Sequence, residues 1–135
     1  MRAERSPRGT VPRVFISYAR ADSDIAARLA DELRADNEVF LDVDSLPVGA
    51  NFQEELRRTI EKSDVVLVLM SPAYFSSQWA KTELSLALEE GKRLLPVRLS
   101  GEPDGALSYL VYLDASDLST SELAAKATSV IRSVV

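Results

Sequence analysis

The sequence contains no histidine and no cysteine, and these two absences narrow the chemistry that the chain can perform. Without cysteine there are no disulfides, thiolate nucleophiles or thiolate metal sites. Without histidine there is no Ser-His-Asp arrangement, and nearly all zinc chemistry is excluded. Any chemistry performed here must therefore use carboxylates, hydroxyls, lysines or the backbone.

Long apolar runs are also missing, since the longest one, residues 65–70, is far too short to cross a bilayer. Residues 1–13 hold four arginines and one acid, a net charge of +3, so the other 122 residues carry −8 of the total of −5. Such an acidic body is a poor binder of nucleic acid, which needs clustered lysine and arginine. Residues 1–12 have no apolar stretch behind their arginines. We therefore expect a disordered basic leader rather than a signal peptide, and a cytoplasmic protein.

Predicted strands alternate with predicted helices along the rest of the 135 residues. The strands are expected over residues 13–18, 38–42, 64–70, 94–99 and 109–113, and the helices over 22–36, from 52 onward, and over 73–76, 78–90 and 121–133. This alternation predicts one α/β domain over residues 13–135, a flavodoxin-like, doubly wound parallel sheet of about five strands flanked by helices.

A few residues mark the expected ends of these elements. Asp22 or Ser23 is predicted to cap the first helix, and Asn51 the second. Gly91 is expected to end the helix over residues 78–90. Pro96 lacks a backbone N–H, so it suggests an edge strand or a bulge.

Trp79 and Glu83 are the most informative pair in the sequence. They stand four residues apart on a predicted helix, so their side chains share one face. An indole beside a carboxylate can offer a flat wall for a planar cationic ring and a negative charge to hold it. The alternative is purely structural, with Trp79 as a core aromatic and Glu83 as an acid favoured by the helix dipole.

The loop after the first predicted strand lies where open α/β sheets bind ligands. Arg20 in this loop could pair with a pyrophosphate or could be a solvated surface arginine. Tyr18 could line a ligand site or belong to the core. Phe15 is a further candidate for the ligand wall, although its place in a strand, like that of Phe40, favours the core.

The segment after the second predicted strand contains two acids and an apolar stretch. Asp42 and Asp44 could hold a ribose hydroxyl or a divalent ion, or could only position the loop, and two carboxylates are a weak metal signal. Leu46, Pro47 and Val48 suit burial against a partner or against the domain's own helix.

Four segments in this order resemble a Toll/interleukin-1 receptor (TIR) domain. They are residues 14–18 (VFISY), 40–42 (FLD), 46–49 (LPVG) followed by Phe52, and 71–84, which begin with Ser-Pro and contain Trp79 and Glu83. The resemblance covers residues 13–133 and is greatest to the bacterial and plant branch of the family, where an acid follows the tryptophan at this distance.

The resemblance implies one of two functions. Many bacterial and plant TIR domains cleave NAD+ at the nicotinamide–ribose bond once they self-associate, with the acid of the tryptophan–acid pair, here Glu83, as the catalytic residue. Other TIR domains only recruit one another. The enzymatic alternative implies NAD+ as substrate, no cofactor and no metal, a homo-oligomer, and a sensor domain elsewhere in a longer protein. The expected assembly loop consists of Ser45, Leu46, Pro47, Val48, Gly49 and Ala50.

Two other α/β families are excluded by the residues at their sites. A phosphoacceptor receiver domain needs an aspartate at the end of the third strand, where this chain has the residues LMSP at 69–72. A dinucleotide-binding Rossmann domain needs glycines after the first strand, and residues 17–20 contain none. The tryptophan–acid pair favours an NAD+ glycohydrolase, expected to release nicotinamide with ADP-ribose or a cyclic ADP-ribose isomer as the effector part of a bacterial defence or toxin system. The alternative is a TIR domain that signals by assembly alone.

Overall fold

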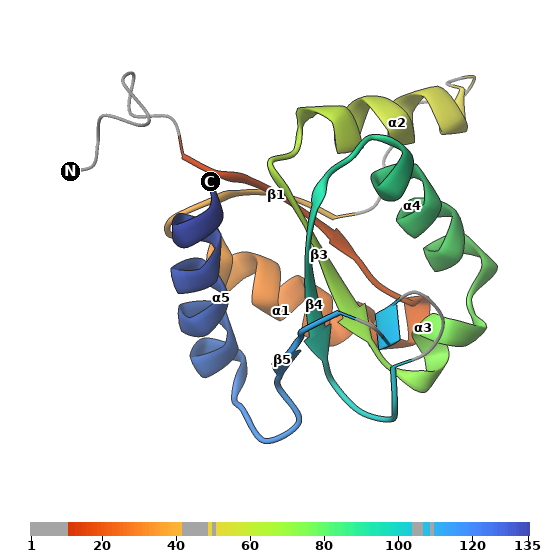
Figure 1. The fold of residues 1–135 in the computed structure, drawn as a ribbon. Helices are drawn as coiled ribbons and strands as arrows, with labels where there is room; N and C mark the ends of the chain where they lie inside the picture. The colour runs from red at the N-terminus through yellow and green to blue at the C-terminus, as the bar shows by residue number, and fades with distance from the viewer. Residues whose placement is uncertain (1–10, 42–48, 50, 104–106, 109) are drawn as a thin grey trace.

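The computed structural model describes residues 11–41, 49, 51–103, 107–108 and 110–135 (Figure 1). Most of the predicted leader lies outside this range. The same is true of Asp42, Asp44, Ala50, the segment from Ser45 to Val48, and the side chains of residues 52, 53 and 79.

Five parallel strands form a single sheet in the order β2-β1-β3-β4-β5, which confirms the flavodoxin-like prediction. Every residue of the central strand β3 is buried, as expected of a parallel strand that is covered on both faces. The strands are β1 (Arg13–Ser17), β2 (Glu38–Phe40), β3 (Val65–Met70), β4 (Arg93–Arg98) and β5 (Leu113–Asp114).

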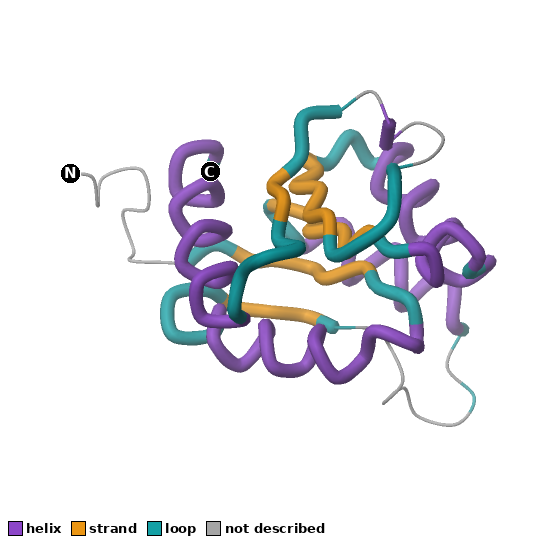
Figure 2. The backbone as a smooth tube through the Cα atoms, turned by 90° about the horizontal axis from the view of Figure 1, so that it is seen from below, coloured by secondary structure: helices purple, strands orange, loops and turns teal. Residues whose placement is uncertain are grey.

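Helices cover both faces of the sheet, so the core has two halves (Figures 1 and 2). Side chains alternate along each strand, so Val14 and Ile16 pack in the half that contains α1 and α5, and Phe15 packs in the other half. The helices are α1 (Ser23–Leu33), α2 (Phe52–Lys62), α3 (Pro72–Ser76), α4 (Gln78–Glu89) and α5 (Thr120–Val134), with a 3₁₀ turn, η2 (Arg20–Asp22), before α1.

The predicted helix ends are confirmed at two of the three positions. The side chain of Asn51 accepts a hydrogen bond from the backbone N–H of Glu54 at 3.0 Å and so caps α2. Gly91 follows α4 with φ of +67°, a conformation that glycine adopts at little cost. At the start of α1 the prediction is wrong in its mechanism, because the side chain of Asp22 makes no capping bond and accepts one from Ser71 instead.

The prediction of an edge strand or bulge at Pro96 is also wrong, because β4 lies between β3 and β5 and pairs with β3 in unbroken register. β5 is shorter than predicted and pairs only with Val97 and Arg98. Pro96 therefore stands beyond the end of the β4–β5 ladder. This position explains how a residue without a backbone N–H is accommodated in an internal strand.

We expect Gly101→Ala to destabilise the protein more than Gly91→Ala. Both glycines have positive φ, a strain of about 1–2 kcal/mol for alanine. A Cβ at Gly101 would also lie 3.0 Å from Cγ of Pro72, whereas a Cβ at Gly91 would meet nothing within 4 Å. Denaturant unfolding of the two variants tests this, and equal losses would show that the contact with Pro72 relaxes freely.

Candidate functional site

Three side chains from different elements meet at the end of β1. Ser17 is the last residue of β1, Tyr74 comes from α3 and Glu83 from α4. Ser17 Oγ donates a hydrogen bond to Glu83 Oε1 at 2.9 Å, and Ser17 Oγ lies 2.9 Å from Tyr74 Oη. Because the strands are parallel, this cluster lies at the carboxyl edge of the sheet, where α/β folds bind ligands.

All three side chains are withdrawn from solvent. The exposed fraction is 1% for Glu83 and 0% for Ser17 and Tyr74. A carboxylate removed from water costs several kcal/mol unless hydrogen bonds replace its hydration. The hydroxyl of Ser17 supplies one such bond, so the charge on Glu83 is held in place by a neutral donor.

Tyr74 is kept in its neutral form. Burial raises the pKa of its hydroxyl above the usual range, and the negative charge of Glu83 raises the pKa further, while the hydrogen bond with Ser17 opposes both effects. The phenol therefore keeps its proton and can donate it. Besides Ser17, an acceptor within reach is the backbone carbonyl of Ala80, at 3.4 Å from Oη.

A second set of contacts ties the neighbouring loops together. Ser71, which follows β3, donates to Asp22 Oδ2 at 2.6 Å and accepts from the backbone N–H of Tyr74 at 3.1 Å. These bonds fix α3 to the turn η2. Arg20 lies in the same turn and is exposed, so it remains a candidate for binding an anionic group.

Of the other predicted site residues, two lie in the core, and the structure describes one more only in part. Phe15 is fully buried in the core, with no exposed surface for a ligand. Tyr18 is 9% exposed and packs with the α1 and α5 half of the core. Trp79 lies in α4 four positions before Glu83, as predicted, but its side chain is outside the described residues. Gly49 is exposed with φ of +92°.

Ser17 and Tyr74 were not among the residues singled out from the sequence. A signal for Ser17 was available, since the period of two along a strand places it on the same face as the apolar Phe15. A hydroxyl in that position needs a buried partner. Nothing in the sequence identified that partner, because Tyr74 and Glu83 are 57 and 66 positions away.

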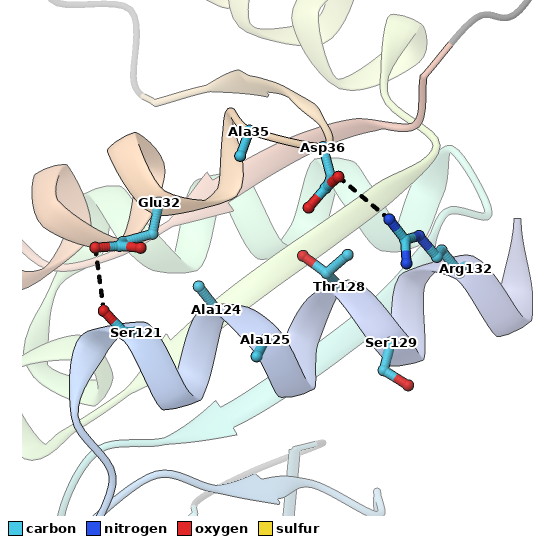
Figure 3. Close-up of a pocket in the computed structure, with 9 residues that line it drawn as sticks. All are labelled: Glu32, Ala35, Asp36, Ser121, Ala124, Ala125, Thr128, Ser129 and Arg132. Carbon is cyan, nitrogen blue, oxygen red and sulfur yellow. Dashed lines mark hydrogen bonds and ion pairs between the residues drawn. The ribbon is translucent and has the colours of Figure 1, made fainter.

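A separate cavity of about 450 Å³ lies between α1 and α5 (Figure 3). Four of the polar side chains that line it bind one another: Arg132 pairs with Asp36 at 3.2 Å, and Ser121 donates to Glu32 at 3.2 Å. Among the described residues, no group of three or more potential ligands could hold a metal ion. Within the same ranges, no helix has both the length and the apolar character needed to cross a membrane.

The family model and a plant relative point to the same family. A model of the TIR domain matches residues 14–128. A Brachypodium distachyon protein named as a probable 2′ cyclic ADP-D-ribose synthase is 29% identical over 97 residues, which are 70% of this chain and 43% of the plant protein. The chain thus spans less than half the length of that relative.

Solved TIR domains have the same fold. The TIR domain of the Toll-related receptor TRR-2 from Hydra magnipapillata is 25% identical with a TM-score of 0.74, over 88% of this chain and 97% of the receptor domain. The TIR domains of the activated Roq1 resistosome, which recognises the pathogen effector XopQ, are 26% identical with a TM-score of 0.55. That match covers 64% of this chain and 57% of the Roq1 chain.

We expect Ser71→Ala to lower the free energy of unfolding by about 2–3 kcal/mol, because it removes both the cap of α3 and the bond to Asp22. Ser77→Ala is the matched control, since Ser77 caps α4 through the N–H of Ala80. Its expected cost is about 1 kcal/mol. Equal losses in denaturant unfolding would show that the Asp22 bond does not stabilise the fold.

Proposed function

The chain belongs to the family of TIR domains, and from this premise we propose that it is an NAD+ glycohydrolase that cleaves the bond between nicotinamide and ribose. The observation that carries the proposal is the buried, hydrogen-bonded carboxylate of Glu83 at the carboxyl edge of the sheet. A module that only assembles gains nothing from an acid there, and burying one is costly. The relative named as a cyclic ADP-ribose synthase supports the same reaction class.

The reaction suits a protein without histidine. Nicotinamide in NAD+ is already cationic, so it leaves as a neutral molecule when the bond electrons pass to its ring nitrogen, and no general acid is needed. The ribose becomes an oxocarbenium-like cation, as in glycoside hydrolysis. Glu83 stabilises that cation and binds the ribose hydroxyls. Attack by water then gives ADP-ribose and a proton, whereas attack by a hydroxyl of the same molecule gives a form of cyclic ADP-ribose and likewise releases a proton. Neither route needs a cofactor or a metal.

Other residues would bind the rest of the substrate. Arg20 is exposed beside the end of β1, where its guanidinium can pair with the pyrophosphate. Trp79 would form the wall beside the ribose or a base, from its position one helical turn before Glu83. Asp42 and Asp44 remain candidates for positioning the loop or holding a ribose hydroxyl.

Self-association would switch the enzyme on. Glu83 is 1% exposed in the single subunit, so substrate can reach it only after the site opens. We assign that opening to contacts between subunits through the loop that contains Pro47 and Gly49. In the whole protein a sensor domain would trigger assembly in the cytoplasm, as the effector part of a bacterial defence or toxin system. The alternative is a scaffold that signals by assembly alone.

The first prediction from this proposal concerns Glu83→Gln. The amide keeps the shape of the side chain and can still accept from Ser17, but it lacks the charge. We expect NAD+ consumption and nicotinamide release, measured at high protein concentration, to fall at least about 100-fold. Glu89→Gln is the control, because Glu89 is an exposed acid of the same helix. This variant should consume NAD+ at the wild-type rate.

Two outcomes would contradict the proposal. A folded, assembled wild type that leaves NAD+ intact would identify the domain as a scaffold. A Glu83→Gln variant that is folded by circular dichroism and fully active would leave the reaction without its proposed catalytic residue.

The second prediction concerns Gly49→Pro. Proline fixes φ near −65°, whereas Gly49 has φ of +92°, so the loop must change its path. Gly49 is exposed and a Cβ there meets nothing within 4 Å, so the fold should be kept. We expect smaller assemblies by sedimentation velocity and lower NAD+ turnover. An unchanged size distribution and activity would contradict this, as would full wild-type activity at nanomolar protein with no concentration dependence.

A further inference from the structure

Tyr74, Ser17 and Glu83 form a continuous chain of polar atoms inside the protein. The two links, Tyr74 Oη to Ser17 Oγ and Ser17 Oγ to Glu83 Oε1, are both 2.9 Å long. The three residues come from α3, β1 and α4, and all are at most 1% exposed. The carboxylate of Glu83 is therefore linked to α3 as well as to the sheet.

The donors in this chain follow from the chemistry of each group. An ionised carboxylate can only accept, so Ser17 must give its single proton to Glu83. Ser17 Oγ can then only accept from Tyr74, and it is the nearer of the two acceptors of the single tyrosine proton, at 2.9 Å against 3.4 Å for the carbonyl of Ala80. Each hydroxyl polarises the next, so the bond to the carboxylate is stronger than an isolated hydrogen bond from serine.

The position of the tyrosine hydroxyl is fixed independently of Glu83. The backbone N–H of Tyr74 is bound by Ser71, which is itself bound to Asp22. Its ring also packs edge-to-face on Phe75, with centroids 5.6 Å apart at 85°. These contacts hold the ring of Tyr74 in place. Its hydroxyl can therefore orient Ser17, and through Ser17 the carboxylate of Glu83.

We propose that Tyr74, acting through Ser17, is a positioning residue that aims the Glu83 carboxylate at the ribose. This inference rests on the function proposed above. Neither hydroxyl touches substrate, and the pair has its effect when charge develops on the sugar. A misdirected carboxylate should therefore lower kcat more than it raises KM, because under the proposed function Arg20 and Trp79 would bind the rest of NAD+ in the ground state.

The test compares Tyr74→Phe and Ser17→Ala with the double variant. Tyr74→Phe removes one oxygen and keeps the ring, and we expect kcat to fall about 10- to 100-fold with KM within about twofold. Because Tyr74 acts through Ser17, the double variant should be no slower than Ser17→Ala alone. Tyr112→Phe removes a hydroxyl from an exposed tyrosine and serves as the control with wild-type kcat.

A crystal structure of Tyr74→Phe provides a readout that does not depend on activity. We expect the Glu83 carboxylate to turn from its wild-type orientation or to occupy two. An unmoved carboxylate would overturn the inference, whether or not the wild type cleaves NAD+. A wild type that does not cleave NAD+ would overturn only the proposed function. Wild-type kcat in Tyr74→Phe, or additive losses in the double variant, would also overturn it. A folded Tyr74→Phe with lower thermal stability and unchanged kcat would assign Tyr74 to the core alone.

Discussion

The hydrogen bond from Ser17 to Glu83 is the contact on which the arrangement of the carboxyl edge depends. It joins the first strand of the sheet to α4 across 66 positions of sequence, and it provides a partner for a carboxylate that has left water. Without such a partner, burial of the charge would cost several kcal/mol. The same bond therefore joins α4 to the sheet, beside the core packing of Ala80, Leu86 and Ala87, and offsets part of the cost of burying the acid.

The parallel topology explains why these groups meet. β1 and β3 are neighbours, so Ser17 at the end of one strand lies beside the segment that follows the other. That segment begins with Ser71, which binds Asp22 and starts the short helix that carries Tyr74. The strand ladders fix the ends of both strands, and the loops add only short connections. A cluster built in this way is held in place by the fold itself, as a preorganised site would require.

The sequence predicted the parts of the structure that depend on local patterns. The buried run of β3, the capping of α2 by Asn51 and the end of α4 at Gly91 all follow from residues close to one another, and the alternation of elements led to the strand order. The tryptophan–acid spacing led to Glu83 as the candidate catalytic residue, and that role stays a prediction. The hydrogen-bonded chain of Tyr74, Ser17 and Glu83 was missed because the local pattern predicts only a strand at Ser17 and a helical turn at Tyr74. The prediction of an edge strand or bulge at Pro96 was wrong because a proline fits in the internal strand β4 only where the short ladder with β5 does not reach it, and the sequence does not show the length of that ladder.

Under the proposed function, the buried position of Glu83 would link catalysis to assembly in energetic terms. If the closed subunit is the dominant state, a partner can open it only to the extent that it binds the open state more tightly. Moving a population from 1:99 to 99:1 requires about 5.5 kcal/mol of such preference, which an interface between subunits can supply. The hydroxyls that hold the carboxylate belong to β1 and α3. If the site opens without changing the orientation of the Glu83 carboxylate, the elements that move must be others than β1 and α3. The acid then becomes accessible while Ser17 and Tyr74 keep it in place.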